Sequence, residues 1–265
     1  MAAVNQTSDN GATIRDERAT SMPCRYWTRL VLSIGVCVYL LSQISPPSRA
    51  TAQALTCQSN ACAYLPLIIG NSHATVFIRS WRSFIGPPYS DRLRIVGEIE
   101  NGGTETIYWV QMSARLYDEH GTFLALGSGG TFMHSIDAGM RSPFEVPVFN
   151  PPTGFANIEL DVRYELSSPL NWRCLPVPVL SQHTRNEGGL EVFGEVRNPH
   201  ARELFGIYIA FTFYASDGSV YDVGATLSDV GSLPSDAITT YKLRTFKTNL
   251  LGVPFTVQAQ GCYIP

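Results

Sequence analysis

The sequence predicts an all-β protein in which two tandem antiparallel β-sandwich domains follow an N-terminal export segment. Three observations favour this class: an internal repeat, short stretches of alternating polarity, and turn residues roughly every 8–12 positions. No stretch after the first 54 residues has helical periodicity. A hydrophobic content of 45% with 15% charged residues is typical of folded domains.

The repeat becomes visible when the sequence is shifted against itself by 97 residues without a gap. Identical pairs that carry the match are Gly97 and Gly194, Glu98 and Glu195, Asn101 and Asn198, and Tyr117 and Tyr214. Solenoid repeats have periods of roughly 20–50 residues, so a period near 100 indicates a whole small β domain. We therefore expect both copies to share one strand order.

The repeat and the flanking composition divide the chain into five parts. Residues 1–54 are predicted to be a signal peptide or N-terminal anchor, 55–73 a mature leader, 74–166 repeat 1, 167–173 a linker, and 174–265 repeat 2. This division places every folded domain after the export segment.

The N-terminal part resembles an export signal in its layout. An apolar run of 12 residues, 30–41, follows two arginines and precedes small residues that suit cleavage after Ala52 or Ala54. The run is shorter than the roughly 20 residues of a membrane-spanning helix, although an uncleaved anchor stays an alternative. Translation starts at Met1 or Met22. We expect the mature chain to be secreted or held at the cell surface.

Four cysteines remain after this segment, namely Cys57, Cys62, Cys174 and Cys262. In an exported chain they predict two disulfides with three possible pairings. Cys57 and Cys62 are close enough for a local loop, which leaves Cys174 with Cys262. A parallel pairing of first and last strands would hold that second pair beyond the roughly 7 Å Cα limit, so the pairing stays open.

The clearest predicted strand covers residues 108–117 and its counterpart 205–214. One row is apolar in both copies and is expected to face the core: Tyr108, Val110, Met112, Ala114 and Leu116, with Phe205, Ile207, Ile209, Phe211 and Phe213. Residues 93–100 alternate in the same way and predict a strand with one buried face.

The residues of this strand resemble a known module. Residues 97–101 and 194–198 follow a Gly-Glu-hydrophobic-x-Asn pattern, and 114–118 read Ala-Arg-Leu-Tyr-Asp where 211–215 read Phe-Thr-Phe-Tyr-Ala. Both copies resemble the FxLYD domain of bacterial exported and cell-surface proteins. The resemblance implies an immunoglobulin-like sandwich and no catalytic residues.

The outward row of this strand differs between the copies, and it supplies the candidate binding residues. Trp109 aligns with Gly206, and Arg115 with Thr212. Exposed Trp and Arg are enriched at binding hot spots, so we predict a contact patch of Trp109 and Arg115. The alternative is that the neighbouring domain or the leader covers Trp109.

The sequence contains no recognisable catalytic or metal-binding constellation. Glu98 and Glu195 fall in different domains and are expected to be solvated or locally hydrogen-bonded, not paired for acid–base chemistry. The acidic segment 118–120 is interpreted as a solvated turn. Tyr117 and Tyr214 are expected to pack over a hairpin with their hydroxyls bonded to backbone. We therefore predict no enzyme, no metal and no cofactor.

These observations predict a non-catalytic exported protein that binds or spaces other components at the cell surface or in the extracellular space. The partner is expected to be an unknown protein or glycan of the cell envelope. A net charge of −3 without a basic patch argues against nucleic acid, and membrane contact would come only through an uncleaved N-terminal segment. Alternatives are a carbohydrate- or protein-binding accessory module with exposed aromatics, or a hydrolase with a shallow acidic site.

Overall fold

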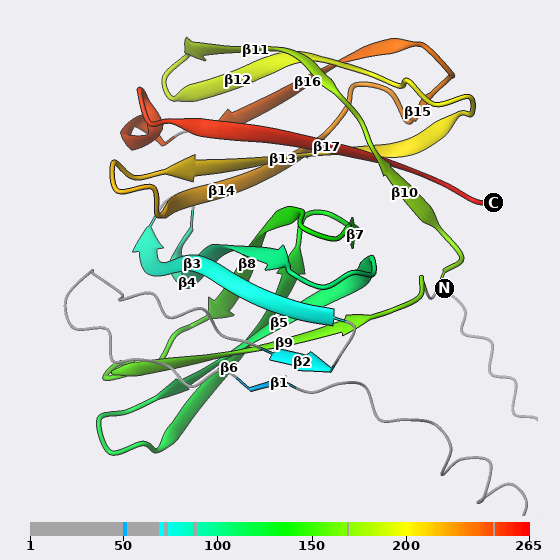
Figure 1. Ribbon diagram of the computed structural model, residues 1–265. Coiled ribbons are helices and arrows are strands. Elements are labelled where there is room, and N and C mark those ends of the chain that lie inside the picture. Colours follow the sequence, from blue (N-terminus) through cyan, green and yellow to red (C-terminus); the bar gives the residue numbers. More distant parts are fainter. Residues whose placement is uncertain (1–49, 52–68, 72–73, 87–88, 169, 246) are drawn as a thin grey trace, which may run out of the picture. The chain divides into compact units, whose positions relative to one another are not determined.

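Antiparallel strands make up almost all regular structure in the computed structural model, which describes residues 50–51, 69–71, 74–86, 89–168, 170–245 and 247–265 (Figure 1). The described part adds one short 3-10 helix, Thr248–Leu250. The predicted all-β sandwich class is confirmed. Among these residues, no helix has the length and apolar character needed to cross a membrane. The predicted signal or anchor lies outside the described residues except for residues 50–51, so it stays a prediction.

Repeat 1 is a sheet that folds over on itself. Two short strands from the segments predicted as export signal and leader, β1 (Ala50–Thr51) and β2 (Ile69–Asn71), join this sheet. The strands of the repeat itself are β3 (Ala74–Gly86), β4 (Tyr89–Asn101), β5 (Ile107–Tyr117), β6 (Phe123–Thr131), β7 (Ser135–Ile136), β8 (Arg141–Phe149) and β9 (Asn157–Glu165). The order is β1-β9-β5-β6-β8-β4-β3-β2, and β7 pairs with β5. The halves β9-β5-β6 and β8-β4-β3 enclose one apolar core that includes Ile95, Met112 and Phe144.

Repeat 2 has two separate sheets. Its strands are β10 (Arg173–Pro176), β11 (Val179–Asn186), β12 (Leu190–Arg197), β13 (Leu204–Tyr214), β14 (Val220–Leu227), β15 (Ser232–Leu233), β16 (Ile238–Thr245) and β17 (Phe255–Tyr263). One sheet has the order β10-β17-β13-β14 with β15 beside β13, and the other has the order β11-β12-β16. Val192, Ile209, Phe211 and Tyr241 lie in the core between them.

The two repeats share their strand order, as the sequence predicted, except at their start, where Arg173–Pro176 pair with β17 but the aligned residues of β3 pair with β4. The pairings β3–β4, β4–β8, β5–β6, β5–β7 and β5–β9 recur as β11–β12, β12–β16, β13–β14, β13–β15 and β13–β17. The Thr131–Phe144 pair of repeat 1 recurs as an isolated bridge between Ser228 and Tyr241. The gap-free offset therefore reflects one strand plan used twice.

Two buried asparagines fix the same corner in each repeat. Asn101 donates through Nδ2 to the carbonyl oxygens of Glu105 (2.7 Å) and Ile136 (2.8 Å), and its Oδ1 accepts from the Gly103 amide (3.0 Å). Asn198 makes the three equivalent hydrogen bonds with Arg202, Leu233 and His200. The side chain satisfies buried backbone groups where each chain leaves one sheet, which explains why both copies have Asn there.

The matched glycines are required by close approach of backbone. A Cβ atom at Gly97 would lie 2.5 Å from the carbonyl oxygen of Ser80, and one at Gly194 would lie 2.0 Å from that of Ser181. Real Cβ atoms do not come so near, so β3 packs against β4, and β11 against β12, only if glycine is present.

The predicted core row is wrong at one position in each repeat. Ile107 and Leu204 are buried, whereas Tyr108 and Phe205 are only partly buried. A β-bulge interrupts the register with β9 after Tyr108 and the register with β17 after Phe205. Because an extra residue reverses the alternation of a strand, the core row changes parity at the bulge.

A disulfide joins the first and last strands of repeat 2. Cys174 and Cys262 are direct partners in the antiparallel β10–β17 pair, with Cα atoms 3.9 Å apart. The parallel arrangement that cast doubt on this pairing is therefore wrong. Cys57 and Cys62 lie outside the described residues. Strand β9 ends at Glu165 and β10 begins at Arg173, so the predicted linker 167–173 lies between them except for its last residue, which belongs to β10.

Candidate functional site

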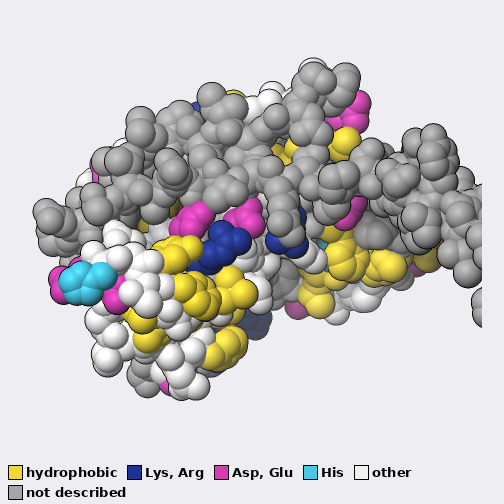
Figure 2. All heavy atoms as spheres, turned by 90° about the horizontal axis from the view of Figure 1, so that it is seen from below, with side chains coloured by type: hydrophobic (Ala, Val, Ile, Leu, Met, Phe, Trp, Pro, Cys, Tyr) yellow, Lys and Arg dark blue, Asp and Glu magenta, His cyan; other side chains and the backbone are white. Residues whose placement is uncertain are grey.

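An open groove lies on the outer side of the β9-β5-β6 half of repeat 1. It has a volume of about 510 Å³. Its lining residues are Gln111, Met112, Ser113 and Arg115 of β5, Leu126, Ser128 and Gly129 of β6, and Arg163 of β9. The view from below shows hydrophobic side chains next to basic and acidic ones (Figure 2). Of the two predicted binding residues, Arg115 lines this groove.

The groove is hollow because small residues meet at its centre. Ser113 of β5 is the cross-strand partner of Ser128 of β6. Two residues closer to the hairpin the side chains are large again, since Arg115 is the partner of Leu126. Residues directly opposite in an antiparallel pair lie on the same face, so this arrangement leaves a trough with one raised end.

The raised end of the groove carries a shared cation. The Arg115 guanidinium lies 3.5 Å from Glu159 Oε1 and 3.6 Å from Asp161 Oδ2. The Tyr117 hydroxyl donates to Glu159 Oε2 at 2.9 Å, and this hydrogen bond raises the pKa of Tyr117. Asp161 is buried, and its Oδ1 has no hydrogen-bond partner among the described residues. The end of the groove therefore offers the partly exposed guanidinium of Arg115 to a polar partner, whereas the Asp161 carboxylate is buried behind it.

Trp109 occupies the bulge of β5 in a left-handed conformation. Its φ is 48°, and the aligned Gly206 has a φ of 54°. The Trp109 amide donates to the carbonyl oxygen of His134 (3.2 Å), as the Gly206 amide donates to that of Gly231 (3.1 Å). Bulky residues rarely adopt positive φ, and such conformations concentrate at functional sites. The ring is 39% exposed.

Trp109 and Arg115 do not form a single compact patch. They are six residues apart on β5, which corresponds to roughly 20 Å along an extended strand. Arg115 lines the groove, and Trp109 lies beyond its opposite end at the bulge. A partner that contacts both would have to cover the length of the strand.

The same face of repeat 2 is covered by repeat 1. The residues equivalent to the groove of repeat 1 include Ala210, Thr212, Val223 and Gln260, and all four are buried. Both repeats belong to one compact unit, residues 47–265. Val96 of β4 packs with Val220 and Val223 of β14, and Gln260 bonds with the backbone and hydroxyl of Ser135.

Arg94 joins the two repeats within this interface. It donates to both Glu145 oxygens (2.8 and 2.7 Å) in repeat 1 and to Asp222 Oδ1 (3.0 Å) in repeat 2. Lys247 donates to the other Asp222 oxygen. Burial opposes the charge of Arg94, but the two carboxylates outweigh it and raise the Arg94 pKa, whereas burial lowers the pKa of Lys247. Strong coupling of this kind makes one partner costly to remove.

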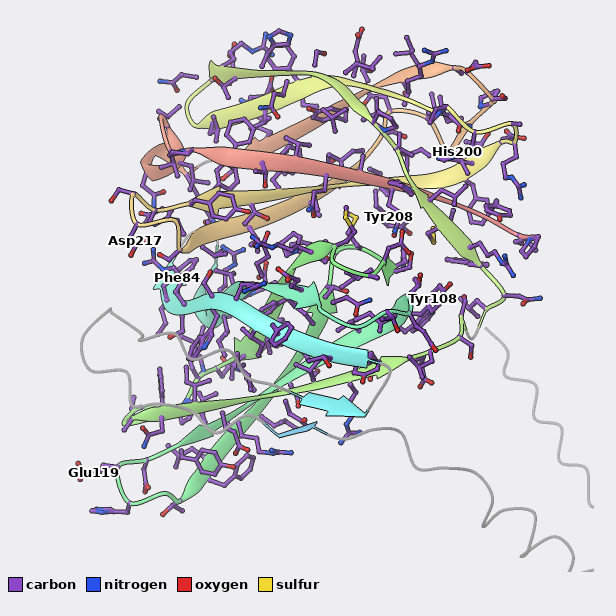
Figure 3. The ribbon with its side chains drawn as sticks, in the orientation of Figure 1. Phe84, Tyr108, Glu119, His200, Tyr208 and Asp217 are labelled. Carbon is purple, nitrogen blue, oxygen red and sulfur yellow. A yellow bond between two sulfur atoms is a disulfide. The ribbon has the colours of Figure 1, made fainter. Side chains whose placement is uncertain are left out.

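A smaller cavity of about 170 Å³ lies beside this network. It is lined by Arg82, Phe84, Ile85, Tyr221, Asp222, Lys247 and Asn249. Phe84 lies at the end of β3, near the β13–β14 hairpin that carries Asp217 (Figure 3). Its ring lies under the Arg94 guanidinium, 5.3 Å from centroid to Cζ. The first three lining residues belong to repeat 1 and the other four to repeat 2, so the cavity is part of the interface between the repeats.

The sequence did not single out Arg94 or Asp222. Charged residues on the polar row of a strand are normally exposed, so both resembled ordinary surface positions. Divergence is the signal that could have found them, because Arg94 aligns with Glu191 and Asp222 with Ala125. The basic residue is present only in repeat 1 and the acidic residue only in repeat 2. Opposite charges divided in this way indicate a contact between the two repeats.

The structure corrects three predictions about matched residues. Glu98, expected to be solvated or locally hydrogen-bonded, is buried; it accepts from Arg141 on the neighbouring strand (3.3 Å) and also from the Tyr214 hydroxyl of repeat 2 (3.0 Å). Glu195 is exposed, as predicted. Tyr117 and Tyr214 bond carboxylates, not backbone, through their hydroxyls. Phe123 packs edge-on to Tyr117, so the ring does lie over its hairpin.

The acidic turn and the two matched glutamates do not converge on one site. Glu119 lies at the tip of the β5–β6 hairpin (Figure 3), and the Asp118 carboxylate accepts from the His120 and Thr122 amides. Within the described ranges, no group of three His, Cys, Asp or Glu side chains could hold a metal ion.

Comparison with known proteins yields only remote similarity. No family model matches the sequence, and no curated protein matches it significantly. A Bacteroides uniformis β-glucuronidase, bound covalently to cyclophellitol-6-carboxylate aziridine, is 14% identical over 58% of this chain and 21% of its own, with a TM-score of 0.18. A β-glucuronidase from glycoside hydrolase family 2 is 12% identical over 84% of this chain and 27% of its own, with a TM-score of 0.19. The chain thus spans about a quarter or less of these enzymes, and such scores carry no argument about function.

Proposed function

We propose that this protein is a non-catalytic exported spacer that holds two β-sandwich repeats in a fixed orientation and uses the open face of repeat 1 for binding. The resemblance of both repeats to the FxLYD domain supports a place at the cell surface or in the extracellular space. The disulfide between Cys174 and Cys262 supports an oxidising compartment.

The observation that carries the spacer role is the buried charge network around Arg94. Domains joined by a polar, solvated interface move relative to each other by default. Here Arg94, Glu145, Asp222 and Lys247 are held between the repeats, and a rotation would leave charges buried without partners. The hydroxyl of Tyr214 on Glu98 adds a second connection.

The repeats also approach each other around the linker, through aromatic rings. His134 of repeat 1 packs edge-on against Tyr208 (4.3 Å between ring centroids) and Trp172 (6.1 Å). Trp172 packs in turn against Phe205 (5.5 Å). The linker therefore contributes its own side chain to the interface, which favours one orientation.

Backbone ¹⁵N relaxation tests the spacer role. A rigid pair tumbles as one body, so amides of both repeats should give one rotational correlation time. Arg94→Leu removes the shared cation and should give the repeats separate, shorter correlation times while each keeps its dispersed spectrum. Arg185→Leu is the matched control, because Arg185 pairs only with Glu187 and Glu191 within repeat 2 among the described residues. Two correlation times in the unsubstituted protein would reject the spacer role.

The binding role includes the alternative of an accessory module that takes a glycan or protein through an exposed aromatic. Trp109 supports that alternative, since a partly exposed ring is held in a strained conformation. Capture of cell-envelope material by the unsubstituted protein and by Trp109→Gly measures the contribution of the ring. Equal capture by both would exclude Trp109 from the binding surface.

A further inference from the structure

The open face of repeat 1 and the covered face of repeat 2 are the same face of one fold. The 97-residue offset places β5, β6 and β9 of repeat 1 on β13, β14 and β17 of repeat 2. In repeat 2 this face receives the outer side of β3 and β4 from repeat 1. One interface of this fold therefore already exists within the chain.

The exposure of matched residues differs sharply between the two faces. Val220 and Val223, which pack against Val96, are 2% and 4% exposed. Phe123 and Leu126 take their places in repeat 1 and are 54% and 60% exposed. Repeat 1 thus has larger apolar side chains than repeat 2 at the two contact positions, although nothing described covers them. Clustered apolar exposure of this kind marks association surfaces.

The chain also has a second copy of the surface that does the covering. The outer row of β4 that contacts repeat 2 consists of Arg94, Val96 and Glu98. Its counterpart on β12 consists of Glu191, Phe193 and Glu195. As on β4, an apolar residue stands between two charged ones. Phe193 is larger than its counterpart Val96, just as Phe123 and Leu126 are larger than their valine counterparts.

Charged side chains stand at the edges of both free surfaces. The groove of repeat 1 includes Arg163, which has no ion-pair partner in the described part of the chain, and Arg115, which is already ion-paired within repeat 1. The free surface of repeat 2 presents Glu195, which is exposed. The neighbouring strands add basic side chains to the same face, namely Arg185, Lys242 and Arg244. A contact between Glu195 and Arg163 would favour one register of docking over others.

We propose that the outer β5-β6-β9 face of repeat 1 binds the outer β11-β12 face of repeat 2 from a second copy of this chain. Contact between copies then repeats the contact within the chain, with Phe193 seated on Phe123 and Leu126. Because each copy uses a different surface at each end, the interface is heterologous and the assembly grows head to tail. This proposal deepens the binding role by naming the partner.

Two variants, each damaging one surface, test the assembly in the full chain. Leu126→Glu damages the receiving surface of repeat 1, and Phe193→Glu damages the inserted surface of repeat 2. Met140→Glu is the control, because Met140 is exposed but belongs to neither surface. Sedimentation equilibrium should give an average mass that rises with concentration for the unsubstituted chain and for the control. Each surface variant alone should stay monomeric.

Mixing the two variants gives the decisive measurement. Each still has one working surface, so an equimolar mixture should form dimers and nothing larger. A mixture that stays monomeric overturns the proposal, as does an unsubstituted chain that is monomeric up to about 1 mM, the weak end of specific association. The second result holds whether the face is empty, covered by the leader or used by another protein. A rigid monomer would reject the assembly and leave the spacer role intact.

Thermal unfolding of each variant guards against a folding artefact. Leu126 is largely exposed, so Leu126→Glu should keep the unfolding temperature of the unsubstituted monomer. If Phe193→Glu is less stable, Glu195→Arg offers a second damaged donor surface at an exposed position. Self-association that survives Leu126→Glu and Glu195→Arg alike would overturn the proposal.

Discussion

Tyr214 donates its hydroxyl to Glu98 across the boundary between the repeats, at 3.0 Å, whereas the matched Tyr117 donates to Glu159 within its own repeat, at 2.9 Å. The residue of repeat 2 that aligns with Glu159 is Thr256, which lies 3.4 Å from the Tyr214 hydroxyl. The same tyrosine thus finds a carboxylate in both places, and in repeat 2 the carboxylate comes from the other domain.

This difference predicts unequal effects of the same substitution. Tyr214→Phe leaves buried Glu98 without one of its donors and should lower the free energy of unfolding by about 1–3 kcal/mol. Tyr117→Phe affects a carboxylate that is only partly buried and keeps Arg115, so its effect should be below about 1 kcal/mol. Urea unfolding followed by tryptophan fluorescence measures both. Equal effects would contradict the assignment of Tyr214 to the interface.

The two asparagine corners predict the opposite outcome, namely equal effects. Asn101→Ala and Asn198→Ala each remove the three matched hydrogen bonds to buried or partly buried backbone groups, and Asn198→Ala also removes one to the Pro234 carbonyl. Each should destabilise its repeat by at least about 2 kcal/mol, because the carbonyl groups are left without donors. Hydrogen exchange resolved by repeat measures the two losses separately. A large loss in only one repeat would argue against a shared role.

The bulge predicts that Gly at position 109 gives a more stable protein than Ala, the reverse of the usual order in a strand. In an ordinary strand Ala is more stable than Gly, but at a φ of 48° the Cβ atom is strained by about 1–2 kcal/mol. Trp109→Gly should therefore unfold at a higher temperature than Trp109→Ala. Gly206→Ala provides the mirror test and should be destabilised, since its φ is 54°. A Trp109→Ala variant more stable than Trp109→Gly would mean that the bulge relaxes when the ring is removed.

The sequence predicted what the repeats have in common and missed what lies between them. The offset was sufficient for strand order because Gly97, Asn101 and their counterparts serve the same local contacts in both copies. Alternation predicted the core rows except at the bulge, where an inserted residue changes parity without any change in residue type. Neither signal depends on how the domains pack.

The interface was invisible for a physical reason. Arg94 and Glu98 stand on the polar row of β4, and a polar row covered by another domain has the same sequence pattern as one covered by water. Burial of such residues depends on partners far away in the chain, such as Asp222 and Tyr214. The contact patch of Trp109 and Arg115 stays a prediction, and the six residues between them on β5 show that one row on a strand is not one location.

His134 predicts how the stability of the interface depends on pH. It lies between Tyr208 and Trp172, its Nε2 has no hydrogen-bond partner among the described residues, and burial lowers its pKa. In the unfolded chain a histidine has its usual pKa of about 6.5. The unfolded state therefore binds a proton at a pH where the folded state does not.

It follows that the contribution of His134 to the free energy of unfolding is complete above about pH 6.5 and is lost as the pH decreases toward the lower pKa of the folded state. The unfolding temperature of the unsubstituted protein should drop between pH 7.5 and pH 5.5, by an amount that His134→Phe reduces. Phe keeps the ring contacts and removes the buried unpaired nitrogen, so it should not lower stability at neutral pH. His120→Asn is the control, because His120 is exposed on the hairpin and is not part of the interface. Equal slopes for the unsubstituted protein and His134→Phe would show that His134 is protonated in the folded state and that the interface admits its charge.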